Sequence, residues 1–314
     1  MSFHPETESY KYWTQEEDLK LKDLVESNLY DFKDIGRQLN RSASSCQSHS
    51  RFLGFKSGYV RRKYFHTEDF FKTPNLLNCY WAGMLAADGS ITHNSKLGST
   101  LRLEIADIDH LYQFKKDVGF TGRIEDCFKN GSISNTKTVR INSCFWAKDL
   151  KDNFGIIPNK SYRLTPPNLN NDLLRFAFLL GYIDGDGCIC LCKRKVDTEL
   201  SLSLSIVSCS PSILLFLKDM VDRYFINYRL RKKKQVMGKC PGSNNASIIQ
   251  FSGMQALMIL DYFQGFPVPK LARKWQNPKV LEFLVQKKLE YPNFFKLTPE
   301  LQVIKDQFML TPPV

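Results

Sequence analysis

The chain has 314 residues, which is enough for about two domains at a usual size of roughly 150 residues each. Hydrophobic residues make up 43% of the chain and charged residues 24%, and this balance excludes a largely disordered or fibrous protein. Lysine and arginine number 44 against 32 aspartate and glutamate residues, so the formal net charge is +12. Such a basic excess predicts a polyanionic partner, most simply nucleic acid.

We expect an intracellular protein without a membrane segment. The longest apolar run, residues 176–183, is far too short to cross a membrane, and the first residues lack the pattern of a secretory signal. Nine cysteines at irregular spacing favour a reducing compartment over a disulfide framework. This predicts the cytoplasm or nucleoid, or the nucleus if the host is eukaryotic.

The first 55 residues predict three short helices. Thr14 and Glu17 form a capping box before the first helix, and Asp31 and Ser42 can cap the second and the third. Gly54 then ends the third helix. A small all-helical module therefore opens the chain.

The aromatic residues of this module carry a resemblance. Trp13, Phe32 and Phe52 stand 19 and 20 residues apart, and the segment opens with W-T-x-E-E-D. This resembles a Myb/SANT-type helix-turn-helix, which implies that the three aromatics lie in the core and that the third helix binds DNA. A protein-binding module, as SANT domains can be, is the alternative. Polar side chains without an acid form the expected DNA-binding face of the third helix, at Ser44, Ser45, Gln47, Ser48 and Arg51.

Two similar segments follow, YWAGMLAADGSI at 80–91 and LLGYIDGDGCI at 179–189. Aligned on their final Asp-Gly, they place Asp88 and Asp186 98 residues apart, and each continues as helix, two strands, helix, two strands and helix. The predicted fold class is therefore α+β, built from a repeat of about 100 residues. The predicted domains are a three-helix module at 1–55, a basic linker at 56–74, repeats at 75–170 and 171–290, and a C-terminal tail at 291–314.

The repeated helices have an unusual end. Small residues four apart, Gly83 with Ala87 and Gly181 with Gly185, would let two helix backbones approach closely. Each helix then ends in aspartate, against the negative end of its dipole. Two such charges repel by about 4 kcal/mol at 4 Å and an effective dielectric near 20. This arrangement favours a bound cation, and oxygen ligands alone select Mg²⁺ or Ca²⁺.

The two segments resemble the LAGLIDADG signature, and the resemblance spans about residues 70–280. It implies two pseudo-symmetric αββαββα repeats that form a DNA-binding saddle, and cleavage of both DNA strands that leaves short 3′ overhangs. It also implies Mg²⁺ or Mn²⁺ as the cofactor. The implied metal ligands are the carboxylates of Asp88 and Asp186 and the backbone carbonyls of Ala87 and Gly185.

Other positions follow from the same resemblance. The first signature carries Ala86 where the second has Asp184, a position that is structural in the family. The segment at 154–164 resembles the one that carries a basic residue near the scissile phosphate, which indicates Lys160. In the second repeat Lys274 is the first choice and Lys270 the second. A lysine there would stabilise developing charge or orient the attacking water.

Strand alternation predicts the face that would lie on DNA. The basic run RLRKKK at 229–234 could instead be a solvated segment or a nuclear-import signal. The C-x-C-x-C run at 188–192 places successive thiols about 7 Å apart on a strand, which is too far for a closed zinc site. The residues expected to face DNA are Ser90, Thr92, Asn94, Lys96, Arg140, Asn142, Cys188, Cys190, Cys192, Arg194, Ser201, Ser203, Ser205, Arg229, Arg231, Lys233 and Gln235.

These observations predict a free-standing, metal-dependent homing endonuclease. We expect a monomer with internal pseudo-two-fold symmetry, bound to a long asymmetric site in double-stranded DNA. An intron maturase that binds RNA and a non-cleaving DNA-binding regulator are the alternatives. Both aspartates are present, which favours cleavage, and the Myb-like module favours duplex DNA.

Overall fold

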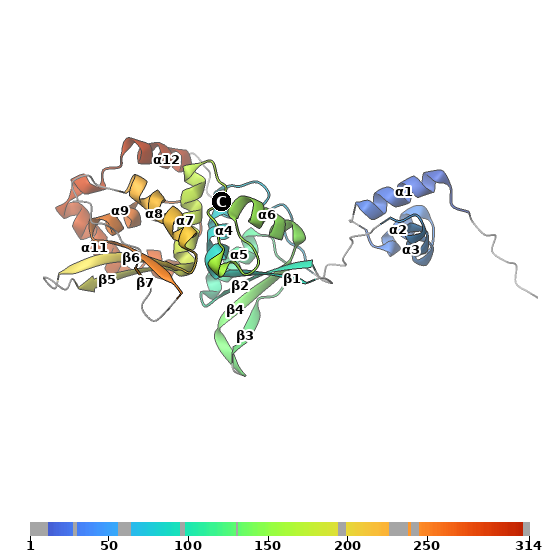
Figure 1. Ribbon diagram of the computed structural model, residues 1–314, viewed down its shortest axis with the longest axis horizontal. Helices are drawn as coiled ribbons and strands as arrows, with labels where there is room; N and C mark the ends of the chain where they lie inside the picture. The colour runs from blue at the N-terminus through green and yellow to red at the C-terminus, as the bar shows by residue number, and fades with distance from the viewer. Residues whose placement is uncertain are drawn as a thin grey trace, which may run out of the picture. The chain divides into compact units, whose positions relative to one another are not determined.

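The computed structural model describes residues 12–27, 30–55, 64–94, 98–129, 131–193, 199–225, 238–239 and 245–309. The chain divides into two compact units, Met1–Tyr64 and Phe65–Val314 (Figure 1). In the part of the chain that is described, no helix is long and apolar enough to cross a membrane.

The first unit is a three-helix module, as predicted. Its helices are α1 (Gln15–Glu26), α2 (Phe32–Leu39) and α3 (Ala43–Phe52). Side chains of Thr14, Asp31 and Ser42 accept hydrogen bonds from the first turns of the three helices, which confirms the expected caps. The core consists of buried Leu21, Val25, Ile35, Leu39 and Cys46.

One of the three aromatic residues predicted to lie in the core of this unit does not. Trp13 and Phe32 pack against the core, but the side chain of Phe52 is 83% exposed. Cys46 and Ser50 define the buried face of α3, and Phe52 lies about 200° around the helix from Ser50. Phe55 packs on the core instead, because the chain reverses after α3 at a glycine with positive φ and the Phe55 amide bonds to the Ser50 carbonyl.

The second unit contains two copies of one αββαββα pattern, which confirms the predicted fold class. The first copy consists of α4 (Leu76–Asp88), β1 (Gly89–Asn94), β2 (Gly98–Ile105), α5 (Ile108–Asp117), β3 (Glu125–Lys129), β4 (Ser132–Asn142) and α6 (Cys144–Phe154). The second consists of α7 (Asp172–Asp186), β5 (Gly187–Lys193), β6 (Leu200–Ser208), α8 (Pro211–Tyr224), β7 (Gly238–Lys239), β8 (Ser247–Ser252) and α9 (Met254–Gln264).

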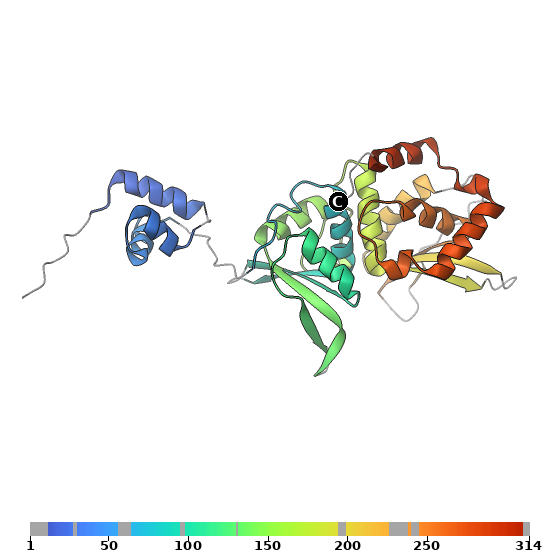
Figure 2. The same ribbon diagram turned by 180° about the vertical axis from the view of Figure 1, so that it is seen from behind.

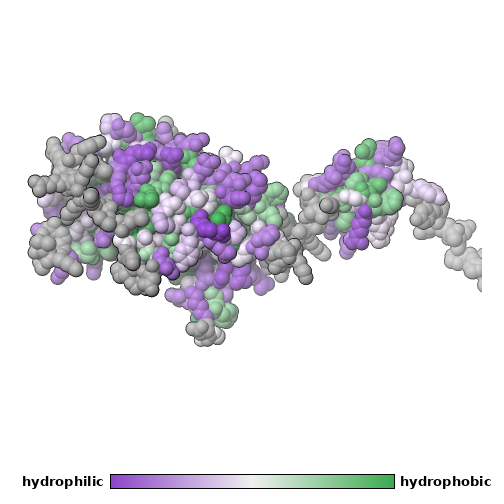
Figure 3. All heavy atoms as spheres, in the orientation of Figure 1, coloured by the Kyte–Doolittle hydropathy of each residue, from purple (hydrophilic) through white to green (hydrophobic). Residues whose placement is uncertain are grey.

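Each copy forms one antiparallel four-stranded sheet. The strand orders are β1-β2-β4-β3 and β5-β6-β8-β7, which are equivalent positions in the two copies. Helices cover one side of both sheets, and α4 and α7 pack side by side between the copies (Figures 1 and 2). Alternate residues of the central strands point into this helical layer, for example buried Leu101 and Leu103 in β2 and Leu202 and Leu204 in β6. On the face in Figure 3, hydrophilic residues predominate on the described surface.

The segment before α4 is not all linker. We expected a linker over 56–74, but residues from Phe65 onward belong to the second unit. The Thr67 amide donates to the Val118 carbonyl at 2.9 Å, and the side chain of Phe71 is fully buried. This stretch therefore contributes to the first repeat because its aromatic residues supply part of the core. Residues 56–63 lie outside the described part.

The C-terminal region is also more ordered than a tail. After α9 the chain forms α10 (Ala272–Trp275), α11 (Pro278–Glu290), a 3₁₀ turn η2 (Pro292–Phe295) and α12 (Pro299–Met309). Helix α12 packs against α7 and buries Leu301 and Ile304. The expected tail at 291–314 thus contains a packed helix, because these two residues give it an apolar face.

Candidate active site

Helices α4 and α7 touch through their backbones. A Cβ added to Gly83 would lie 2.0 Å from the Phe178 carbonyl oxygen, and one added to Gly181 would lie 1.9 Å from the Tyr80 carbonyl oxygen. No side chain fits between the two helices at these positions. The predicted close approach of the signature helices is therefore present in the structure.

The same contact brings the two helix ends together. A Cβ added to Gly185 would lie 2.2 Å from the Ala87 Cβ and 3.3 Å from a carboxylate oxygen of Asp88. Asp88 and Asp186 are the last residues of α4 and α7, so both carboxylates lie at this junction. Glycines with extended backbone follow both and start strands β1 and β5. The structure therefore brings together the four predicted metal-site residues.

The surroundings of Asp88 and Asp186 raise the pKa of both carboxyls. Burial raises the pKa of Asp186 to about 6, and the negative charge of Asp88 acts in the same direction. Packing of protein around Asp88 also raises the pKa of that carboxyl, although its side chain reaches solvent. The ammonium groups of Lys160 and Lys274 act in the opposite direction on both acids. The junction is therefore a mixed cluster of two acids and two bases.

Lys160 lies at the end of α4. It starts a 3₁₀ turn, η1 (Lys160–Tyr162), and its side chain is buried. Its Nζ donates a hydrogen bond of 2.9 Å to the Ala87 carbonyl oxygen. Burial lowers the pKa of Lys160, whereas the charges of Asp186 and Asp88 raise it.

Lys274 lies at the corresponding end of α7. Its buried Nζ is 2.8, 2.5, 3.2 and 2.6 Å from the carbonyl oxygens of Ile183, Asp184, Gly185 and Gly187. An ammonium group has three protons, so these carbonyls share them. Burial lowers the pKa of Lys274, and the nearby carboxylates oppose that shift.

The structure separates the two lysines between which the sequence left a choice. Lys270 Nζ donates to the carbonyl oxygens of Phe263, Gln264 and Phe266 at 2.7–3.0 Å, and so closes the end of α9. Burial lowers its pKa to about 8. Lys274, one helical turn later in α10, is the lysine at the acid pair.

A tyrosine next to Asp186 was missed by sequence reasoning. The hydroxyl of Tyr182 donates to the Ser208 Oγ at 3.0 Å, and the presence of this phenol lowers the pKa of the Asp186 carboxyl against the larger effect of burial. Its position one turn before Asp186 on α7 was a usable signal, because residues four apart share a helix face. The equivalent residue of α4 is Met84, so α4 itself supplies no such phenol beside Asp88.

These groups fit a divalent cation of the hard type. The donors at the junction are carboxylate and backbone carbonyl oxygens, which Mg²⁺ prefers over nitrogen and sulfur ligands. The described residues contain no cluster of three or more His, Cys, Asp or Glu side chains that could hold a metal. A cation here would depend on the Asp88 and Asp186 carboxylates and on the Ala87 and Gly185 carbonyls, and each of these carbonyls now accepts a hydrogen bond from a lysine.

The strand residues predicted to face DNA lie on the sheet faces away from the helices. Ser90, Thr92, Arg140 and Asn142 are exposed, as are the three cysteines of β5. In the second sheet the register pairs Cys188, Cys190 and Cys192 with Ser205, Ser203 and Ser201, so all six share one face.

Ser203 is an exception to exposure. It is buried because the Gln250 side chain in β8 donates to its Oγ at 2.8 Å. The predicted residues that lie outside the described part, or whose side chains do, are Asn94, Lys96, Arg194, Arg229, Arg231, Lys233 and Gln235.

Two residues of these faces were not predicted. Gln250 covers Ser203, and Arg102 lies opposite both Ser90 and Arg140 in the first sheet. The alternation of Leu101, Arg102 and Leu103 could have indicated Arg102. It forms a 2.5 Å ion pair with Glu104.

In the first unit, α3 presents the predicted polar face. Ser44, Gln47, Ser48 and Arg51 are exposed, and Ser45 is half-buried.

Comparisons with known proteins agree with both resemblances. Residues 13–71 match the family model of the Myb-like DNA-binding domain, and residues 174–250 match that of the LAGLIDADG-like domain. Among solved structures, the LAGLIDADG meganuclease I-AabMI bound to uncleaved DNA is 12% identical, covers 76% of this chain and 99% of its own, and has a TM-score of 0.45. The LAGLIDADG meganuclease I-CpaMI bound to uncleaved DNA is 14% identical, and the match covers 76% of this chain and 100% of that chain with a TM-score of 0.42. The LAGLIDADG homing endonuclease I-GzeII in complex with a DNA target is 15% identical, and the match covers 74% of this chain and 98% of that chain with a TM-score of 0.40. No curated protein matches the chain.

Proposed function

We propose that this chain, with its Myb-like DNA-binding domain and LAGLIDADG-like domain, is a site-specific DNA endonuclease that makes a double-strand break. One observation carries the proposal: two carboxylates meet at the ends of α4 and α7, and a buried lysine lies at each end. Two acids with two bases at a pseudo-two-fold junction supply one set of groups for each DNA strand.

The residues have separate tasks in this proposal. Asp88 and Asp186 would hold Mg²⁺ or Mn²⁺ together with the Ala87 and Gly185 carbonyls. The bound cation supplies Lewis-acid stabilisation of phosphate charge and a water of lowered pKa. The ammonium groups of Lys160 and Lys274 place positive charge at this junction. They would stabilise the negative charge that develops on the phosphate and orient the attacking water.

Binding would use both units. The exposed sheet faces offer hydroxyl, amide and guanidinium groups, which can contact base edges and phosphates. The polar face of α3 offers the same kinds of group in the first unit. The net charge of +12 favours long-range attraction to DNA. The protein would act as a monomer on a long asymmetric site and leave short 3′ overhangs, as LAGLIDADG homing endonucleases do.

The test is cleavage of a randomised duplex DNA library with the full chain and Mg²⁺, followed by sequencing of the cut ends. We expect one family of long sites with staggered ends, and no cutting when EDTA replaces Mg²⁺. Binding to a selected duplex without cutting under any divalent cation would indicate a DNA-binding regulator. Preference for structured RNA over every duplex would indicate a maturase.

A further inference from the structure

The two lysines at the acid pair are held very differently. Lys274 Nζ is within 3.2 Å of four carbonyl oxygens at the end of α7, whereas Lys160 Nζ donates to a single carbonyl, that of Ala87. The difference begins with one departure between the two signatures, since Ala86 stands where the second signature has Asp184.

Asp184 anchors the segment that carries Lys274. Its carboxylate is fully buried and accepts hydrogen bonds from the Leu271 amide at 3.0 Å and from the Trp275 indole at 2.5 Å. These two donors flank Lys274 in the chain, so Asp184 holds the backbone before the lysine and the indole side chain after it. The buried methyl group of Ala86 can accept no hydrogen bond, so α4 offers the Lys160 segment no such anchor at the equivalent position.

The third donor to Asp184 comes from the other repeat. The Tyr80 hydroxyl on α4 donates to Asp184 Oδ2 at 2.7 Å and lies 2.7 Å from the His110 Nε2 on α5. A phenol has one proton, so His110 must donate to the Tyr80 oxygen through Nε2–H. All three side chains are buried, so little water competes for these bonds.

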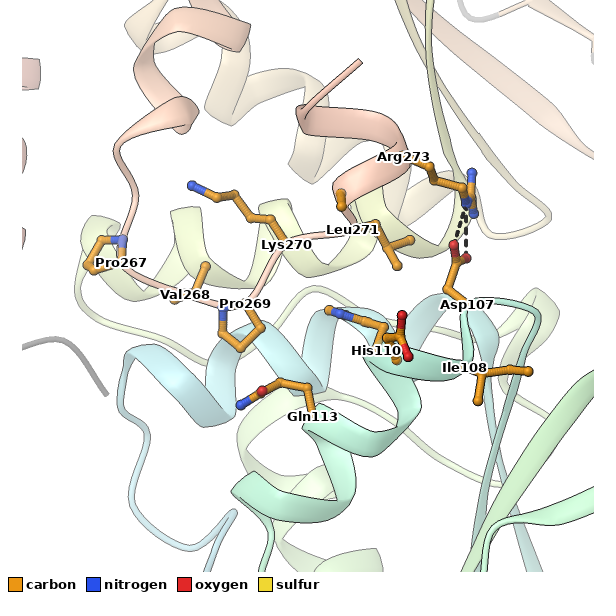
Figure 4. A pocket seen from close by; sticks show the side chains of 12 residues that line it. Asp107, Ile108, His110, Gln113, Pro267, Val268, Pro269, Lys270, Leu271 and Arg273 are labelled. Carbon is orange, nitrogen blue, oxygen red and sulfur yellow. Dashed lines mark hydrogen bonds and ion pairs between the residues drawn. The ribbon is translucent and has the colours of Figure 1, made fainter. Parts of the chain in front are cut away.

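A second link joins α5 to the same segment. Arg273 donates to both carboxylate oxygens of Asp107 at 2.8 and 2.9 Å. Figure 4 shows Asp107, the residue before α5, and His110 on α5 facing the segment that contains Lys270, Leu271 and Arg273. A pocket of about 530 Å³ lies between α5 and residues 267–273. Leu271 and Trp275 are buried, so apolar packing holds this segment, and the bonds to Asp184 and Asp107 add directional constraints on its placement.

From this asymmetry we propose that Tyr80 and His110 are positioning residues for Lys274, and that the two cleavage centres are consequently unequal. This inference rests on the proposed function. The strand served by Lys274 is cut first, because that lysine is fixed before DNA binds. The strand served by Lys160 follows, and a nicked duplex is an intermediate of the reaction. Misplacement of a catalytic group by about 1 Å can cost up to a hundredfold in rate, so loss of the Tyr80 hydroxyl should be measurable on one strand.

The experiment measures the cleavage rate of each strand separately. The full-length chain acts on a selected duplex with either strand end-labelled, under single-turnover conditions with Mg²⁺. Lys274→Gln and Lys160→Gln identify the strand that each lysine serves. Tyr80→Phe should slow the Lys274 strand about tenfold or more and the Lys160 strand less than twofold, so the ratio of the Lys274-strand rate to the Lys160-strand rate should fall about fivefold or more.

Matched variants separate positioning from general stability. Tyr224→Phe also removes a buried tyrosine hydroxyl that donates to a carboxylate, that of Asp172, and should leave both strand rates unchanged. His110→Gln keeps a side-chain N–H donor and should retain most of the rate, whereas His110→Leu should resemble Tyr80→Phe. If Tyr80→Phe does not fold, the His110 pair carries the same prediction.

Several results would overturn the inference. These are equal strand rates in the wild type, equal slowing of both strands by Tyr80→Phe, no slowing of either, or slowing of the Lys160 strand alone. A wild-type protein that cuts no duplex would instead refute the proposed function, and the inference with it.

Discussion

Gly181 of α7 lies against Tyr80 of α4 so closely that a Cβ on the glycine would be 1.9 Å from the tyrosine carbonyl oxygen. Backbone atoms cannot move aside as a flexible side chain can. The contact between the two repeats is thus fixed by main-chain geometry at this point. It also places the residues at the helix ends in a set relationship.

Gly181→Ala should therefore destabilise the second unit by about 3 kcal/mol or more, because the added methyl group must push the helices apart. Gly265→Ala is the matched control, since nothing lies within 4 Å of a Cβ added there. Its effect should stay within about 0.5 kcal/mol. Urea unfolding of the three proteins measures the difference. Equal stability of Gly181→Ala and wild type would mean that the helices do not touch as described.

Removal of either acid should abolish double-strand cleavage without abolishing DNA binding. Asp88→Asn and Asp186→Asn keep the side-chain volume but remove the charge needed for a cation. Cleavage of a plasmid site and a gel-shift assay on the same duplex measure the two activities. Asp152→Asn, on an exposed side chain of α6 that pairs with Lys148, is the control and should cut normally. Full cutting by the double variant would contradict the assignment.

The pH dependence of the free energy of unfolding should reveal the unfavourable environment of the ionised Asp186 carboxylate. The pKa of Asp186 is raised to about 6 in the folded protein, whereas an unfolded aspartate titrates near 3.9. A raised carboxyl pKa means that the unfolded state releases its proton first, so stability falls as pH rises from about 4 to 6. Without divalent cation, the wild type should lose about 2–3 kcal/mol over this range relative to Asp186→Asn.

Measurement of urea unfolding for both proteins in EDTA at pH 4, 5, 6 and 7 checks this. The difference between the proteins matters, because other carboxyls titrate in both. If the free energy of unfolding changed with pH in the same way in both proteins, the pKa of Asp186 would not be raised in the folded state.

Divalent cation should restore part of that stability in the absence of DNA. A ligand that binds only the folded state at ten times its Kd adds about 1.4 kcal/mol. Thermal unfolding at pH 7 with and without millimolar Mg²⁺ or Ca²⁺ should show a rise in Tm for wild type that Asp88→Asn/Asp186→Asn lacks. The same rise in both proteins would place the cation elsewhere on the chain.

The first unit should add affinity rather than chemistry. A chain that begins at Phe65 retains the whole second unit and should still cut its site at high protein concentration. Binding should weaken, because the tethered first unit otherwise binds at a high effective concentration. The slope of log affinity against log salt should become shallower by about 0.9 for each lost phosphate contact. Identical affinity and salt slope for both chains would refute this role. A chain that begins after Phe71 would lack this buried side chain and should be less stable.

The sequence predicted local structure better than long-range contacts. Strand alternation and helix caps depend on residues that are close in the sequence, so most of the helices and strands around Asp88 and Asp186 were predicted correctly. The exposure of Phe52 was missed, because aromatic spacing does not reveal which face of a helix its neighbours bury. The choice between Lys270 and Lys274 depended on a turn of helix after α9. The Asp184 network joins residues from α4, α5 and α10, and no local pattern indicates that they meet.

The main-chain contacts of Gly83 with Phe178 and of Gly181 with Tyr80 have a consequence for engineering new DNA specificities. Side chains on the exposed sheet faces can be exchanged without altering this contact, because they lie on the opposite side of the sheets from α4 and α7. The spacing of the two acids belongs to the backbone and is inherited unchanged by such variants. Under the proposed function, a variant selected for another site would therefore keep the length of the stagger between its two cuts, whatever the sequence of the overhang.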